Sequence, residues 1–121
     1  MSANDVLKRV PLFNDLSEAE VSRFAEVTRE REYPKNSVIL FEDDPGDALY
    51  IVSTGQVKVV LIGEDGREVI LSVLGDGDFF GEMSLIDDEP RSAHVIAMKD
   101  SQLLVLRRDD FQSRLEEQPK I

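Results

Sequence analysis

The chain has 121 residues, no cysteine and a formal net charge of −11, a size that corresponds to one domain with one core. The lack of cysteine excludes disulfides and thiolate metal sites, and the apolar runs are too short for a transmembrane helix or a signal peptide. The acidic balance argues against direct binding to DNA or to an anionic membrane, because both need a basic face.

The N-terminal part of the chain predicts a polar start followed by a capped helix. We expect residues 1–9 to form a loose terminus or a short helix, and residues 10–121 to form a single domain. Ser17 can accept a hydrogen bond from the backbone N–H of Glu20, and the Glu20 carboxylate can bond back, which makes a capping box. The helix should then run to about Thr28, with an apolar face made of Val21, Phe24 and Ala25.

From Val38 onward the spacing of apolar residues becomes that of short β-strands. Turn residues separate these strands, and Asp65-Gly66 has the composition of a two-residue hairpin turn. Many short strands predict a mainly β fold, an antiparallel jelly-roll (double-stranded β-helix) barrel with flanking N- and C-terminal helices. The expected strands are Val38–Phe41, Ala48–Ser53, Gln56–Ile62, Glu68–Leu74, Ala93–Ala97 and Gln102–Leu106.

Alternation within two of these strands predicts which side chains point inward. Lys58 should face water, so the other face of its strand should be buried, and that face carries Val57, Val59 and Leu61. On the adjacent strand Leu71 should also point inward, whereas its neighbour Ser72 should leave the opposite face. Val59 and Leu71 thus offer an apolar surface for a ligand.

The segment 80–97 contains groups that can bind a phosphate. Met83 and Ser84 lie where a short helix can begin, and its free N–H groups favour an anion. Arg91 carries a permanent planar cation that can pair two phosphate oxygens at once. Ser92 adds a hydroxyl donor beside it. This combination predicts a site for a small phosphate ester.

Two more residues of the same segment suit a sugar next to that phosphate. Gly81 has no Cβ, so the backbone there can approach a ligand closely. The carboxylate of Glu82 would repel a phosphate, so it should accept a hydrogen bond from a sugar hydroxyl. Together with the phosphate-binding groups, these residues predict a site for a cyclic phosphate diester on a ribose.

A last amphipathic helix should begin near Arg108, and Pro119 interrupts it. The chain offers no set of residues for metal or nucleophilic chemistry. His94 is the only histidine, we expect it on the surface, and without cysteine it cannot complete a metal site or a catalytic triad. We therefore expect no metal, no cofactor besides a bound ligand, and no enzymatic activity.

The pair Gly81-Glu82, the loop after it and the run Pro90–Ala93 resemble the phosphate-binding cassette of the cyclic-nucleotide-binding domain family. From about Val10 to Gln118, the chain is similar to the sensor domain of catabolite-activator-type bacterial transcription regulators. The resemblance implies that the ligand is bound by Gly81, Glu82, Met83, Ser84, Arg91, Ser92 and Ala93. It also implies that Val59, Leu71, Ser72 and Met83 lie near the base.

The resemblance further implies a cytoplasmic sensor of a bacterial regulatory protein, with cyclic AMP as the ligand. Such regulators continue with a long helix that pairs two subunits and leads to a DNA-binding domain. That helix is largely absent here, so we expect a truncated sensor domain and a homodimer only through the missing helix. We expect neither nucleic acid nor membrane contacts from this chain itself.

Several alternatives stay open at this point. The ligand could be cyclic GMP or a cyclic dinucleotide instead of cyclic AMP. The output could be a DNA-binding domain, a kinase, a channel or a transporter. A different class of function is a ligand-free jelly roll that serves dimerisation or docking, although the intact Gly81-Glu82 and Arg91-Ser92 pairs argue against it.

Overall fold

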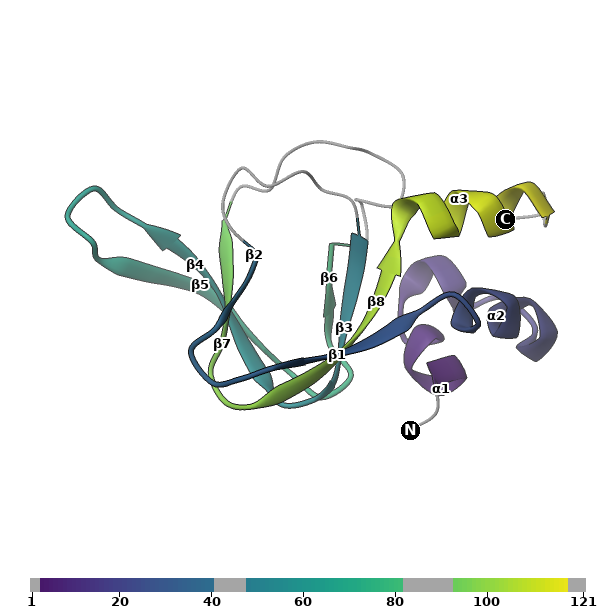
Figure 1. Ribbon diagram of the computed structural model, residues 1–121, viewed down its shortest axis with the longest axis horizontal. Helices are drawn as coiled ribbons and strands as arrows, with labels where there is room; N and C mark the ends of the chain where they lie inside the picture. Colours follow the sequence, from purple (N-terminus) through teal and green to yellow (C-terminus); the bar gives the residue numbers. More distant parts are fainter. Residues whose placement is uncertain (1–2, 41–47, 82–92, 118–121) are drawn as a thin grey trace.

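The computed structural model describes residues 3–40, 48–81 and 93–117 of the chain. Within these residues the fold is mainly β with flanking helices (Figure 1). The helical segments are α1 (Ala3–Leu7), the 3-10 helix η1 (Pro11–Phe13), α2 (Glu18–Ala25) and α3 (Arg108–Glu117). The strands are β1 (Arg29–Tyr33), β2 (Val38–Leu40), β3 (Ala48–Thr54), β4 (Gln56–Ile62), β5 (Glu68–Gly75), β6 (Phe79–Phe80), β7 (His94–Ala97) and β8 (Ser101–Arg107).

The strands form two four-stranded sheets in which all pairs are antiparallel. Sheet A has the order β1-β8-β3-β6, and sheet B has the order β2-β7-β4-β5. The chain changes sheet repeatedly, so strands distant in sequence become neighbours. This arrangement confirms the predicted jelly-roll class with helices at both ends. None of the helices in the described ranges is long and apolar enough to span a bilayer.

Helix α2 begins with the predicted capping box. The N–H of Glu20 donates to Ser17 Oγ at 3.2 Å, and the N–H of Ser17 donates to Glu20 Oε1 at 2.9 Å. The helix ends at Ala25 instead of about Thr28, because the N–H of Thr28 bonds only three residues back, to the Ala25 carbonyl. This tighter last turn directs the chain into β1.

Strand β1 is an element that the sequence analysis missed. Its sequence, Arg-Glu-Arg-Glu-Tyr, has no alternation of apolar residues, and only Tyr33 is partly buried. The strand exists because its backbone pairs with β8 from Arg29 opposite Val105 to Tyr33 opposite Ser101. As the edge of sheet A it keeps charged side chains in water, which discourages pairing with other chains.

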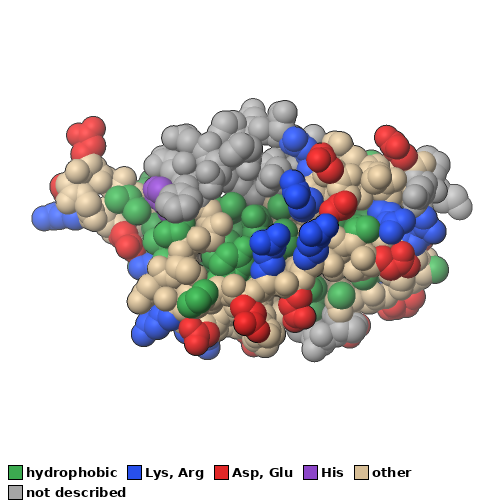
Figure 2. Space-filling view, in the orientation of Figure 1, with side chains coloured by type: hydrophobic (Ala, Val, Ile, Leu, Met, Phe, Trp, Pro, Cys, Tyr) green, Lys and Arg blue, Asp and Glu red, His purple; other side chains and the backbone are tan. Residues whose placement is uncertain are grey.

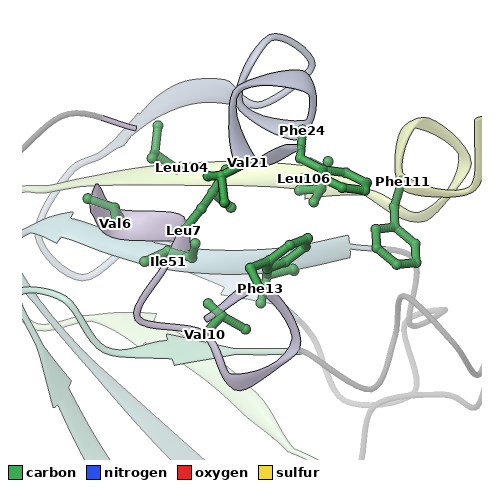
Figure 3. Close-up of a cluster of buried hydrophobic side chains, with 11 residues drawn as sticks. Val6, Leu7, Val10, Phe13, Val21, Phe24, Ile51, Leu104, Leu106 and Phe111 are labelled. Atoms are coloured by element: carbon green, nitrogen blue, oxygen red, sulfur yellow. The ribbon is translucent and has the colours of Figure 1, made fainter. Parts of the chain in front are cut away.

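The main core lies between the helices and the outer face of sheet A. Phe13, Phe24 and Phe111 come from three separate helical segments and meet there (Figure 3). The ring of Phe24 lies 5.2 Å from that of Phe13 and 5.4 Å from that of Phe111, centroid to centroid. Sheet A contributes Leu49, Ile51, Leu104 and Leu106. The aromatic rings thereby join the N-terminal and C-terminal helices into one layer.

A second core fills the space between the two sheets. Val52 and Leu103 reach it from sheet A, and Val57 and Val95 reach it from sheet B, all at most 4% exposed. The molecule therefore has three layers: helices, sheet A and sheet B. In Figure 1 the β4–β5 hairpin projects beyond these layers, on the side away from the helices.

We predict that Phe111→Ala destabilises the domain by about 3–5 kcal/mol, because it leaves a cavity next to Phe13 and Phe24. For a chain of this size the melting temperature should fall by roughly 10 °C or more. Thermal unfolding followed by circular dichroism measures the change. Val69→Ala, at a position that is 57% exposed, is the control and should change stability by less than about 0.5 kcal/mol. Equal losses would contradict the described packing of α3.

Candidate functional site

The predicted cassette is bounded by two described residues, Gly81 and Ala93. Its other predicted ligand-binding residues lie outside the described residues, so their roles stay predictions; they are Glu82, Met83, Ser84, Arg91 and Ser92. The base-proximal candidates Val59, Leu71 and Ser72 are all described. The described part of the site therefore consists of its two ends, Gly81 and Ala93, and the three base-proximal candidates.

Gly81 directly follows β6, at the edge of sheet A. Its φ of 83° lies in the left-handed region that favours glycine. The turn before β6 is bonded to β3, since the Gly77 N–H donates to the Val52 carbonyl at 2.7 Å and the Val52 N–H donates to the Asp78 carbonyl at 2.8 Å. Tyr50 of β3 then pairs with Phe80. These bonds fix the backbone from which the cassette begins.

Ala93 lies at the other end of the segment, next to β7 of sheet B, and is 8% exposed. Strand β7 pairs with β4, with Val95 opposite Val59 and His94 opposite Val60. The segment between Gly81 and Ala93 therefore has to connect sheet A with sheet B. A ligand held by this segment would be bound at the junction of the two sheets.

Val59 points inward, as alternation predicted. It is partly buried and packs against the core between the sheets. Its direct cross-strand neighbours are Val95 on one side and Ser72 on the other. Because directly paired residues share a face of a sheet, Ser72 lies on the same face as Val59. The expectation that Ser72 leaves the opposite face was wrong.

A β-bulge in β5 explains this error and the one made for Leu71. The register shifts between Val59, opposite Ser72, and Val60, opposite Ile70, which leaves Leu71 without a partner. An extra residue interrupts the period-two alternation of a strand. Leu71 is therefore not packed into the core and is 55% exposed. Leu61 was also expected inside but is 39% exposed, whereas Val60 is fully buried. The bulge is not the cause, because β4 pairs with β7 without a shift; Leu61 follows the last of these pairs, in the hairpin that projects beyond the layers.

Next to Gly81 lies an aromatic pair that the sequence analysis did not identify. The rings of Tyr50 and Phe80 are stacked with centroids 5.0 Å apart and an angle of 3° between their planes. Both are partly buried against the core between the sheets, as Val59 is. The signal was present in the sequence, because Tyr50 alternates with Leu49 and Ile51, which face the helices. The pair thus places two aromatic rings next to the start of the cassette.

The described part of the site carries no charged side chain and is mostly apolar. Val59, Tyr50 and Phe80 carry no charge, and nearby Lys58 is already paired with Glu68 at 2.7 Å. Figure 2 shows apolar side chains gathered at the centre of one face, with charged side chains around them. No cluster of potential metal ligands occurs within the described ranges. Such a surface can pack against a planar base, while an anionic phosphate needs a cation from elsewhere, for which Arg91 is the candidate.

Comparison with known proteins gives consistent matches. The model of the family described as "Cyclic nucleotide-binding domain" matches residues 30–118. The cyclic AMP receptor protein of Thermus thermophilus is 37% identical over 95% of this chain and 53% of its own length. The cAMP-dependent protein kinase regulatory subunit of Aspergillus niger is 36% identical over 90% of this chain and 26% of its own.

A solved structure gives the same result for the fold. The N-terminal domain of a transcriptional regulator from Streptomyces coelicolor superimposes with a TM-score of 0.89 and 37% identity, covering 96% of this chain and 81% of that one. The present chain spans about half the length of the receptor protein that it matches, and less of the kinase subunit. The similarity thus concerns one domain of these longer proteins.

The burial of Val60 and the exposure of Leu61 can be tested by stability measurements. We predict that Val60→Ala costs about 2 kcal/mol of unfolding free energy, because it empties a fully buried position. Leu61→Ala should cost less than about 1 kcal/mol although it removes more carbon atoms, because Leu61 is largely accessible. Urea unfolding of the two variants provides both values. Simple alternation along β4, with Leu61 inside, predicts the reverse order, and that order would contradict the described burial of this strand.

Proposed function

Because the chain belongs to the cyclic nucleotide-binding domain family, we propose that it is a sensor domain whose ligand is cyclic AMP. The observation that carries this proposal is the pairing of Gly81-Glu82 with Arg91-Ser92 inside the matched range 30–118. A similar protein, at 37% identity over 95% of this chain, is named a cyclic AMP receptor protein.

In the proposal, the cassette binds the charged half of the nucleotide. Arg91 pairs the cyclic phosphate through two N–H groups, and Ser92 donates a further hydrogen bond. Backbone N–H groups of Met83 and Ser84 face the same phosphate. Glu82 accepts from the ribose 2′-hydroxyl, which would select ribose over deoxyribose. Because the chain is strongly acidic overall, Arg91 supplies the local positive charge on which an anion depends.

The base of the nucleotide would pack against the inner face of sheet B. Val59 faces this space, and Ser72 lies beside it on the same face. Leu71 sits at the bulge and is exposed, so a base that reaches it would bury apolar surface that water now covers. Each fully buried methylene is worth about 0.8 kcal/mol. These contacts would add affinity for any base and distinguish bases only weakly.

The domain would act as a switch and not as a catalyst. Binding can shift a conformational equilibrium only by its different affinity for the two states, and the cassette joins sheet A to sheet B, so its ligand contacts can change how these parts meet. In a longer protein such a change would reach an output domain through the segment after α3. We propose a cytoplasmic transcription regulator that dimerises through that segment.

The direct test is calorimetric titration of the chain with cyclic AMP. Arg91→Ala should weaken binding at least about tenfold, which corresponds to about 1.4 kcal/mol, because one charge-assisted contact contributes about 1.5–3 kcal/mol. Arg29→Ala, on the exposed edge strand β1, is the control and should leave the affinity unchanged.

Each result of this titration is informative. Unchanged binding by Arg91→Ala would place the phosphate elsewhere and contradict the proposed site. No binding of cyclic AMP to any variant would contradict the proposed ligand. Repeating the titration with cyclic GMP and a cyclic dinucleotide would then distinguish another nucleotide from a ligand-free interaction module.

A glycine pair in this chain separates ligand contact from backbone strain. Gly81 and Gly66 have nearly the same φ, 83° and 82°, and the position of a Cβ at Gly66 is open. Alanine at either position should therefore cost roughly 1–2 kcal/mol of stability. Only Gly81→Ala should also weaken cyclic AMP binding, by about tenfold. Equal affinities of the two variants would remove Gly81 from the binding site.

A further inference from the structure

The stacked rings of Tyr50 and Phe80 belong to directly paired residues of β3 and β6. Their centroids are 5.0 Å apart and their planes differ by only 3°. This separation is close to the distance between neighbouring strands, about 4.8 Å. The rings therefore stand side by side on one face of sheet A, with their flat faces turned across the strands.

Both rings point into the space between the two sheets. Tyr50 and Phe80 pack against the core between the sheets, whereas Ile51, next to Tyr50 on β3, belongs to the core at the helices. Val59 borders the same space from sheet B. The aromatic pair and this base-proximal candidate therefore line one space from opposite sheets.

The Phe80 ring has one flat face that β3 cannot cover. Its strand, β6, is at the edge of sheet A, with β3 on one side and no strand of the described residues on the other. Tyr50 covers the face that is turned toward β3. Phe80 is only partly buried, and the cassette begins at the next residue, Gly81. A ligand bound at the cassette can therefore reach the outer face of this ring.

The fold also holds the Phe80 ring in one orientation. Tyr50 fixes the plane of the ring from one side, and the turn before β6 is bonded to β3 through the Val52 N–H and the Asp78 carbonyl at 2.8 Å. A side chain that is already ordered loses less conformational freedom when a ligand binds to it. The ring is therefore prepared for contact with a flat group.

We propose that the base of the cyclic nucleotide stacks on the outer face of Phe80 and extends the aromatic pair to a stack of three. The inference rests on the proposed function and adds the residue that holds the base. Every base has a flat π-face, and stacking on an aromatic side chain contributes roughly tenfold or more to affinity. The base then lies between Phe80 and the inner face of sheet B.

This contact makes the site selective for the size of the base. The Phe80 side chain has no hydrogen-bonding group, so it does not distinguish adenine from guanine. A two-ring purine covers more of the phenyl ring than a one-ring pyrimidine does, and van der Waals attraction grows with the number of atoms in contact. The stack therefore favours purine over pyrimidine cyclic nucleotides.

The first test compares two neighbouring phenylalanines by calorimetric titration with cyclic AMP. Phe80→Leu keeps an apolar side chain but removes the ring, and it should weaken binding about tenfold. Phe79→Leu is the matched control, because Phe79 pairs with Ile51 and packs against the core at the helices, on the opposite face of β6. It should leave the affinity unchanged, and Phe80→Tyr, which keeps the ring, should bind nearly as well as the unchanged chain. Melting temperatures show whether the variants are folded.

The position of the base can be observed directly by NMR of the labelled chain with bound cyclic AMP. A stacked base lies in the ring current of Phe80, so its H2 or H8 resonance should move upfield and show nuclear Overhauser effects to the Phe80 ring. Phe80→Leu should abolish the upfield shift. Overhauser effects from these protons to residues of sheet B alone would overturn the proposal.

A second ligand tests the selectivity for base size. Cyclic CMP has the same ribose and phosphate with a one-ring base, and it should bind at least about threefold more weakly than cyclic AMP. Phe80→Leu should reduce this difference, because it removes the surface that the larger base covers. A difference that persists unchanged in Phe80→Leu would contradict the stack.

Failure of the stack and failure of the proposed function give different results. If no cyclic nucleotide binds to the unchanged chain, the proposed function fails and the stack fails with it. If cyclic AMP binds and Arg91→Ala weakens it, but Phe80→Leu binds as tightly as the unchanged chain, the phosphate site stands and the stack is refuted.

Discussion

The structure depends on sheet A being covered on both of its faces. Strand β8 shows this most clearly, because Leu104 and Leu106 face the helices while Leu103 faces sheet B. Four consecutive residues of this strand, Leu103–Leu106, are buried, which is the pattern of a strand covered on both faces. Removing either the helices or sheet B would leave one apolar face of sheet A in water.

This constraint places the candidate site where the two sheets meet. Gly81 leaves sheet A, whose backbone is fixed by the bonds between β3 and the turn before β6, and Ala93 enters sheet B. The ends of the cassette are therefore attached to two layers. The aromatic cluster of Phe13, Phe24 and Phe111 joins the helices to sheet A. A change at the cassette would act between rigid layers.

The sequence was informative wherever a local rule applied. The capping box at Ser17 and Glu20, strand β4 and the apolar face of α2 all follow from residue types and short spacings. Local rules failed at β1, which has no alternation of apolar residues, and at Leu71, where a bulge shifts the register. Both depend on which strand lies alongside, and spacing within one segment contains no information about that neighbour.

The sequence by itself determined the family, the jelly-roll class and the chemistry available at the cassette, because a carboxylate, a guanidinium and a glycine keep their properties in any fold. Only the tertiary structure decided which described residues lie near the candidate site. It placed Ser72 beside Val59, exposed Leu71 and added the stacked pair of Tyr50 and Phe80. Register and burial are set by contacts between distant segments, and these exist only after the sheets have assembled.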